Sequence, residues 1–462
     1  MINDLTEGKP MKLIVSFSIP LLIGNIFQQF YSMVDTIIVG KFLGVQPLAA
    51  VGSTGALSAL ILWMLGGLTS GFSVVIAQRF GAGDHDGVRR SVATSTVLCL
   101  IVTAVATVLT VLLTRPMLEL LNTPSDIIDD AASYISVIFA GTAAVVFYNM
   151  LSGILRALGD SRTPLYFLII SSILNVILDL IFIVTFHWGV AGAAYATVIS
   201  QAISGLLCLL FMVKRFPILH MQKKDWKMDW KFTKEHLRIG CPMGIMSSVT
   251  AIGIMLLQSA LNQFGSTTVA AYTAASKVEQ LVVQPAMTFG ITMATYCGQN
   301  LGAGRIDRIR DGVNQCSLLS LVVSVAAGAI VVLFGKPLTL LFISGEQTEE
   351  VINLSRQYLN TIAAFLPVLG MLFIYRNAMQ GMGETIFPML GGGMELLART
   401  IAVYTLPFSL GFGYAGLCFA SPLAWIAATA LLFISYRIKI RKKLQDFAYQ
   451  AASTEQAELL HS

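Results

Sequence analysis

The feature that most constrains this chain is a series of apolar runs, each about 20 residues or longer. At about 1.5 Å per residue, each run is long enough to cross about 30 Å of hydrocarbon as a helix. Hydrophobic residues make up 55% of the chain and charged residues 12%, which is unlike a soluble domain. The alternating ten-residue pattern of a membrane β-barrel is missing, so we expect an all-α integral membrane protein. The twelve predicted spans have approximate cores at 13–38, 47–77, 91–113, 132–156, 165–186, 189–213, 239–263, 268–297, 313–334, 351–378, 386–408 and 412–436.

Lysine and arginine are distributed unequally among the loops between these spans. Placing both termini and the even-numbered loops on one side gives that side 24 basic residues and the other side four. Cytoplasmic loops carry such an excess, so we expect both termini in the cytoplasm. The membrane that we expect for this multi-pass protein is the bacterial plasma (inner) membrane. The first apolar run is full length, so no cleavable signal peptide is expected. Because the basic loops flank spans, they predict topology rather than a nucleic-acid partner.

The sequence carries no pattern typical of an enzyme. The five histidines lie in loops or tails, and the six cysteines lie in or at the ends of apolar helices without metal-ligand spacing. The sequence holds no HExxH, no GxSxG and no Walker-type GxxxxGK[ST] motif. It also lacks the filter motif of a channel. We therefore expect neither an enzyme nor a resident cofactor, but transport that is driven by an ion gradient or runs downhill.

Two halves of the chain repeat each other. AQRFGAGD at 77–84 recurs as GQNLGAGR at 298–305, at an offset of 221, and GVAGAAYAT from Gly189 recurs as GYAGLCFAS from Gly413, at an offset of 224. Each half holds six predicted spans, so the repeats are parallel and form two six-helix bundles, an arrangement that favours alternating access. We expect a monomer. The predicted parts are an N-lobe at 1–213, a cytoplasmic linker at 214–238, a C-lobe at 239–437 and a cytoplasmic tail at 438–462.

Carboxylates within the first half are the main functional signal. Asp179 lies in the apolar stretch SSILNVILDLIFIV, where an ionised aspartate costs on the order of 3 kcal/mol, so such residues usually face a wet cavity and bind ions or protons. Helical depths place Asp35, Asn175, Asp179 and Thr197 together in the outer half of the first bundle. Their oxygens suit a small cation such as Na⁺, or a pair of acids that binds protons. The alternative is a buried carboxylate that is merely hydrogen-bonded within the bundle or permanently neutral.

The repeat supplies an internal control for this site. The positions equivalent to Asp35 and Asp179 are Leu256 and Val403, so the second half lacks both carboxylates. The other two positions of the set, Asn175 and Thr197, correspond to Arg399 and Ser421. If the acids served only to hold a six-helix bundle together, the other copy would be expected to need them too. Their one-sided occurrence favours function.

At these residues the chain resembles the multidrug and toxic compound extrusion (MATE) family over nearly its whole length. The resemblance rests on IPLLIGNIFQQFYSMVDTIIVGKFLG, AQRFGAGD, LRALGDSRTP, NVILD, GVAGAAYATVIS, LRIGCPMG and GQNLGAG. It implies two six-helix lobes in a V around a cleft that export organic cations in exchange for Na⁺ or H⁺. The family's N-lobe cation site then falls on Asp35, Asn175, Asp179 and Thr197. A glutamate known in one branch of the family would align near Thr250, so the resemblance implies no second coupling site in the C-lobe.

Other residues are candidates for substrate binding or for helix bending. Glu279 could attract a cationic substrate near the midplane or be a carboxylate hydrogen-bonded within the C-lobe. Glu395 and Arg399 are four residues apart, which favours an intrahelical ion pair. Pro20 and Pro242 remove a helix hydrogen bond and permit bending. The remaining candidates for lining the substrate cavity are Gln28, Tyr31, Met33, Tyr148, Met150, Gln258, Met287 and Met293.

Two other functions stay open. A flippase of lipid-linked precursors would have a related architecture and a wide basic cavity, whereas Lys277 and Arg399 are the few basic residues predicted at cavity depth. A membrane signalling or assembly protein could keep the fold without transporting anything. Dye efflux from cells, measured with and without a sodium gradient, separates these functions from drug export.

Overall fold

The structure is a computed structural model that describes residues 4–121, 123–340 and 348–461, and these form helices and no strand. The long apolar runs make helices of up to 42 residues because an α-helix pairs its own backbone groups within the bilayer. The first half contains α1 (Pro10–Leu43), α2 (Val45–Gly81), α3 (His85–Leu120), α4 (Ile128–Ala140), α5 (Thr142–Ala157), α6 (Arg162–Asp179), η1 (Leu180–Thr185) and α7 (Gly189–Arg215). The linker and second half contain η2 (Pro217–Leu219), η3 (Lys223–Trp226), α8 (Trp230–Leu261), η4 (Asn262–Phe264), α9 (Ser266–Val282), α10 (Gln284–Gly302), α11 (Ile306–Leu340), α12 (Thr348–Gly381), α13 (Ile386–Tyr404), η5 (Thr405–Ser409), α14 (Gly413–Cys418) and α15 (Ala420–His461).

The predicted all-α membrane fold is confirmed. Among the described residues, ten segments are long and apolar enough to span a membrane, and the bent pair α4 and α5 makes an eleventh. These correspond to eleven of the twelve predicted spans. The twelfth, at 268–297, is divided at Val283 into α9 and α10, neither of which is long and apolar enough alone. Large side chains on the outside agree with contact to lipid: Leu112 of α3 is 72% exposed and Leu333 of α11 is 73% exposed.

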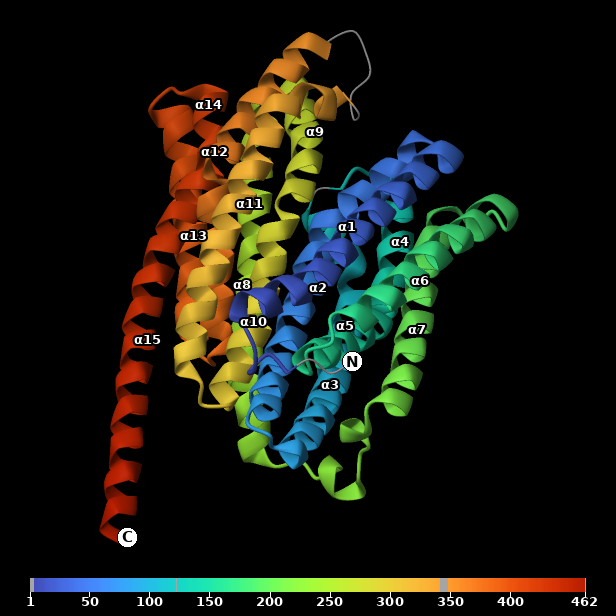
Figure 1. The fold of residues 1–462 in the computed structure, drawn as a ribbon. Helices are drawn as coiled ribbons and strands as arrows, with labels where there is room; N and C mark the ends of the chain where they lie inside the picture. The colour runs from blue at the N-terminus through green and yellow to red at the C-terminus, as the bar shows by residue number, and fades with distance from the viewer. Residues whose placement is uncertain (1–3, 122, 341–347, 462) are drawn as a thin grey trace. The chain divides into compact units, whose positions relative to one another are not determined.

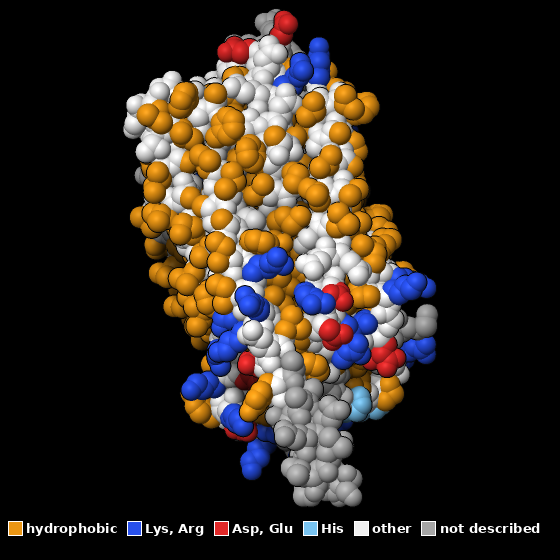
Figure 2. Space-filling view, turned by 60° about the vertical axis from the view of Figure 1, so that its left-hand side comes forward, with side chains coloured by type: hydrophobic (Ala, Val, Ile, Leu, Met, Phe, Trp, Pro, Cys, Tyr) orange, Lys and Arg blue, Asp and Glu red, His pale blue; other side chains and the backbone are white. Residues whose placement is uncertain are grey.

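On one face of the molecule, apolar and charged side chains occupy different regions (Figure 2). Apolar side chains cover most of that face, and Lys and Arg gather toward one end of it, with few charged groups at the other. A spanning protein needs this distribution because charged side chains are costly in hydrocarbon.

The helices form two compact units. The division does not follow the two halves of the sequence strictly, because the start of α1 and the end of α2 belong to unit 2 and most of α8, up to Ala251, belongs to unit 1. The lobe boundaries derived from the sequence therefore stay a prediction. Among the described residues, unit 1 consists of Ile19–Ile76 and His85–Ala251, and unit 2 of Asp4–Ser18, Ala77–Asp84 and the chain from Ile252 onward.

The N-terminal segment is held in unit 2 by hydrogen bonds to α10. The Leu5 backbone N–H donates to Oε1 of Gln299 at 2.9 Å, and Nδ2 of Asn300 donates to the Leu5 carbonyl at 3.1 Å. Further along, the hydroxyls of Ser18 and Thr292 are 2.8 Å apart. These bonds explain why residues before Ile19 group with the second unit.

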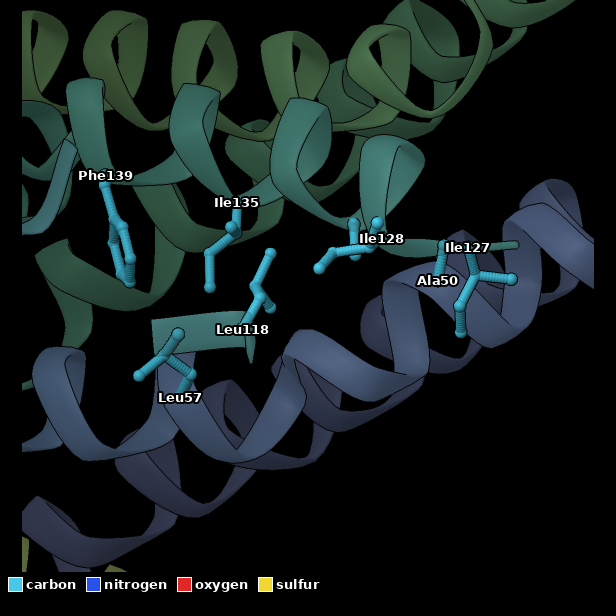
Figure 3. Packing of buried hydrophobic residues seen from close by; sticks show 8 residues of the cluster. Ala50, Leu57, Leu118, Ile127, Ile128, Ile135 and Phe139 are labelled. Atoms are coloured by element: carbon cyan, nitrogen blue, oxygen red, sulfur yellow. The ribbon is translucent and has the colours of Figure 1, made fainter. Parts of the chain in front are cut away.

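One core cluster of unit 1 runs along α4 and consists of leucine, isoleucine and alanine side chains and one phenylalanine (Figure 3). Leu57 of α2 and Leu118 of α3 lie beside Ile135 and Phe139 of α4, and all four are nearly or fully buried. Elsewhere in unit 1, α6 and α5 both pack on α7, as Figure 1 shows for α6 and α7. Close packing of this kind associates helices in a membrane, where lipid is as apolar as leucine.

The bend between α4 and α5 has an identifiable cause. The two helices meet at 45° around Gly141. A Cβ at position 141 would lie 2.1 Å from Cγ2 of Val198 on α7, so only glycine lets α7 approach this closely. Two other predicted irregularities, Pro20 and Pro242, lie inside the continuous helices α1 and α8.

The backbone of the two halves repeats as the sequence does. Gly83 and Gly304 both have φ of +70°, and Gly159 and Gly383 have φ of +81° and +79°. Both repeats also widen into a π-helical segment at the same place, η1 at Leu180–Thr185 and η5 at Thr405–Ser409. The duplication thus extends to local turns.

The linker docks on unit 1 through charged side chains. Asp225 of η3 is buried and pairs with Arg89 of α3 at 3.4 Å, and its Oδ2 accepts a hydrogen bond from the Gln222 backbone N–H at 2.7 Å. Trp226 and Trp230 remain 46% and 73% exposed, which suits an amphipathic ring at a membrane interface.

Candidate functional site

Two carboxylates from different helices meet inside unit 1. Asp35 lies in the C-terminal part of α1, and Asp179 is the last residue of α6 before the backbone widens into η1. Asp179 is completely buried, and the two carboxyl groups lie close enough to share a hydrogen bond when one of them carries a proton. The helical-depth argument placed these acids at one level, and the structure brings their side chains together.

An amide and a hydroxyl complete the set. Asn175, one turn before Asp179 on α6, is 1% exposed, and its Nδ2 donates to Oγ1 of Thr197 on α7 at 3.4 Å. The Thr197 hydroxyl in turn donates to the Ala193 carbonyl at 3.1 Å. The four residues predicted from the sequence therefore lie in one group, contributed by α1, α6 and α7.

The oxygens of this group lack donors. Both carboxylate oxygens of Asp179, Oδ1 of Asp35 and Oδ1 of Asn175 are buried without a hydrogen-bond partner among the described residues. Buried polar atoms are nearly always paired, so several unpaired oxygens in one place are unusual. A proton or a small cation is the species that such oxygens accept. The residues present therefore fit a coupling ion.

Three further polar side chains lie near the acids and were not assigned to this group from the sequence. The hydroxyls of Tyr31 and Tyr134 lie within electrostatic range of both carboxylates without hydrogen-bonding to them, and the Tyr31 hydroxyl hydrogen-bonds with the side chain of Gln201. Tyr134 is on α4 and Gln201 on α7, so only the fold brings them near α1. One signal was present, because Tyr134 has an exact counterpart, Tyr358, in the second repeat.

A cavity of about 140 Å³ lies within unit 1, between α1, α5, α6 and α7. Its wall includes two of the predicted cavity residues, Gln28 and Tyr148, and the Tyr148 hydroxyl donates to the Pro164 carbonyl at 2.9 Å. Met33 and Met150 do not line it, and Met150 is buried in packing. The polar side chains that sequence reasoning did not assign to the wall are Asn25, Asn149, Ser152, Arg156 and Gln201.

The candidates in the second half occupy different surroundings. Met293 is completely buried within unit 2, whereas Met287 is 39% exposed. Nε2 of Gln258 donates to Oδ1 of Asn262 at 3.1 Å. Glu279 accepts a hydrogen bond from the hydroxyl of Tyr358 at 2.8 Å, so this carboxylate is anchored by the counterpart of Tyr134.

A buried ion-pair network lies deeper in unit 2. The predicted pair is confirmed: Nη2 of Arg399 is 2.8 Å from Oε1 of Glu395. A third member, Arg376 of α12, places its Nη2 2.6 Å from Oε2 of the same glutamate. The sequence reasoning missed Arg376 because the pairing crosses from α12 to α13.

This network occupies positions that differ chemically between the repeats. At the offset of 224, Arg376, Glu395 and Arg399 correspond to Ser152, Ser171 and Asn175 in the first half. Ser152 lines the cavity of unit 1, and Asn175 is one of the four residues predicted to bind the coupling ion. In the second half the equivalent positions are filled by long charged side chains that bind each other. The cavity and the free carboxylates thus belong to the first half.

Comparison with known proteins gives one consistent result. A family model described as MatE matches residues 20–181 and 242–405, one match in each half. The chain is 30% identical over 440 residues to the probable multidrug resistance protein YpnP of Bacillus subtilis (strain 168), with 94% of this chain and 96% of that protein covered. It is 27% identical to the probable multidrug resistance protein NorM of Thermotoga maritima, with 82% of each covered.

A solved structure shares the fold as well. A MOP superfamily transporter from Pyrococcus furiosus superimposes with a TM-score of 0.90 at 26% sequence identity, with 95% of this chain and 98% of that chain covered. The relatives are membrane transporters rather than enzymes. From the family match in both halves and the similarity over almost the entire length, the chain belongs to the multidrug and toxic compound extrusion (MATE) family of efflux transporters.

Proposed function

We propose that this transporter exports organic cations across the bacterial plasma membrane in exchange for inward-moving Na⁺ or H⁺, by alternating access. The coupling ion binds at Asp35, Asn175, Asp179 and Thr197. The single observation that carries the proposal is the convergence of unpaired buried oxygens on Asp35, Asn175 and Asp179. Left without a proton or a cation, the two carboxylates repel each other in a poorly hydrated place, so their occupancy strongly affects how the surrounding helices pack.

Helices α1 and α6 each carry residues of the proposed ion site, here called the coupling group (Asp35, Asn175, Asp179 and Thr197), and residues of the cavity wall. Gln28 of the cavity and Asp35 are seven residues apart on α1, or about 10 Å along its axis. Leu168 of the cavity wall precedes Asp179 by about 16 Å on α6. Ion binding that repacks α1 against α6 would therefore change the cavity too. That link supports exchange of substrate against ion.

The orientation and the assembly state belong to the same proposal. The excess of Lys and Arg in one set of loops supports cytoplasmic termini. With that orientation the carboxylates lie toward the outside and the cavity toward the cytoplasm. The transporter works as a monomer, since each chain carries both repeats.

Export of a fluorescent cation such as ethidium tests the proposal. We expect Asp179→Asn and Asp35→Asn to lower the rate of gradient-driven efflux at least about tenfold at unchanged expression. An amide neither takes up and releases a proton nor offers a negative charge to a cation. Asp129→Asn is the matched control, since Asp129 is 81% exposed and, among the described residues, pairs with Arg115 alone at the surface. Imposing a Na⁺ gradient and a pH gradient separately on everted vesicles identifies the ion. Wild-type efflux by both variants under either gradient would contradict the assignment.

A further inference from the structure

The cavity of unit 1 contains one charged side chain. Among its lining residues, Arg156 alone carries a charge, and the other polar members are amides, Ser152 and Tyr148. Arg156 lies in the last turn of α5 and is only partly exposed. A guanidinium that lines a cavity is available to a ligand only if the protein does not already neutralise it.

Within the described part of the chain, no carboxylate pairs with Arg156. Asp160, the nearest acid in sequence, instead accepts hydrogen bonds from the backbone N–H groups of Arg162 and Thr163, each at 3.0 Å, and from the Thr163 hydroxyl at 2.6 Å. Asp160 therefore stabilises the first turn of α6. The two buried arginines of unit 2 differ, because both bind Glu395. Removing a guanidinium from water without an anion is costly, so the uncompensated charge of Arg156 calls for an explanation.

The surroundings of Arg156 suit a carboxylate. The guanidinium presents N–H donors in a planar fork that matches the two oxygens of a carboxylate. The amides of Asn149 and Gln28 in the same wall add N–H donors. At about 140 Å³, the cavity is smaller than the roughly 300–1,000 Å³ of a site that encloses a whole drug. It therefore accommodates one group of a larger molecule.

The second repeat shows that the fold does not need this arginine. At the offset of 224 the counterpart of Arg156 is Gln380, which is 1% exposed. The same turn of the same helix is thus built with a neutral side chain in the other copy. A structural requirement of the helix end would be expected in both.

We propose that Arg156 and the adjoining cavity form a subsite for the carboxylate of transported molecules, so that zwitterions carrying both a cationic and an acidic group are preferred substrates. This rests on the proposed export function, which it extends by naming a substrate class. The cationic part of the substrate lies outside this subsite. Arg156 acts as a specificity residue and takes no part in ion coupling.

Two dyes that differ by one methyl group test the subsite. Rhodamine 110 carries a free carboxylate, and rhodamine 123 is its methyl ester and a simple cation. With purified protein and fluorescence anisotropy, we expect the wild type to bind the acid more tightly than the ester. Arg156→Gln should raise the Kd of the acid by at least about tenfold and leave that of the ester within about twofold. Arg156→Lys, which keeps the charge but loses the fork, should fall between them.

Controls separate this proposal from a structural effect and from the proposed function. Arg162→Gln is the matched control, because Arg162 is an exposed arginine six residues later, at the start of α6, and it should change neither Kd. Unchanged ester binding by Arg156→Gln also shows that the variant is folded. No preference of the wild type for the acid, or equal effects of Arg156→Gln on both dyes, overturns the subsite. If the subsite is overturned in this way, gradient-driven export of the ester by Arg156→Gln would still support the export function.

Discussion

Glu395 holds two buried arginines, and its removal gives the largest change in stability that the structure predicts. Glu395, Arg376 and Arg399 are 5%, 5% and 4% exposed, with N–O distances of 2.6 and 2.8 Å. Glu395→Gln keeps the shape but removes the anion between two cations. Breaking a buried pair typically costs about 3–5 kcal/mol. Because Glu279 also lies near Arg399, it compensates part of that charge, whereas Arg376 forms an ion pair with no acid other than Glu395 among the described residues.

We therefore expect Glu395→Gln to lower the free energy of unfolding by about 3–5 kcal/mol. The assay is equilibrium unfolding by a denaturing detergent in mixed micelles. Glu119→Gln is the control, since Glu119 and Arg115 are both 61% exposed at 3.6 Å and such a pair contributes about 0–1 kcal/mol.

A variant without any of the three charges tests whether the uncompensated charge causes the loss of stability. Arg376→Met, Glu395→Leu and Arg399→Met together replace the charges by apolar side chains of similar length. Replacing all members of a buried network is often neutral or stabilising, so the triple variant should be more stable than Glu395→Gln alone. A loss below about 1 kcal/mol in Glu395→Gln, or a triple variant less stable than the single one, would refute the view that uncompensated charge sets the cost.

Two further expectations follow from packing and from the linker. Gly141→Ala places a Cβ about 2 Å from the Val198 side chain, so the melting temperature should fall and should partly recover with Val198→Ala; unaltered melting of the single variant would contradict the close approach. Asp225→Asn removes the charge that binds Arg89, so trypsin should cleave the 214–229 segment faster than in the wild type, whereas Asp229→Asn, at an exposed pair, should change cleavage little.

The parts of the fold that could be predicted are those set by local pattern. The spans follow from hydropathy, and the duplication follows from GAG and GVAG motifs at fixed offsets. The pair of Glu395 with Arg399 follows from helical spacing alone. The level shared by Asp35 and Asp179 follows from counting residues along two helices from the same membrane surface.

What the sequence did not indicate depends on contacts between helices. Arg376 joins the ion-pair network only because α12 packs beside α13. Arg156 is the last position of the predicted span 132–156, yet it lines a cavity to which four helices contribute. The bend at Gly141 depends on Val198, 57 positions later in the chain. Side-chain spacing along one helix carries no information about such neighbours.

The π-helical segments bear on how the coupling group arose. η1 directly follows Asp179, and such wide turns are often found at functional sites. Yet η5 has the same register in the second repeat, with matching backbone bonds from Phe186 to Ile181 and from Leu410 to Thr405, and there Val403 stands in for the acid. The distortion is therefore inherited by both copies and is independent of the carboxylate. Under the proposed function, the first repeat uses this shared distortion to hold a charge that an ion can neutralise, whereas the second repeat keeps the same backbone geometry around an apolar side chain.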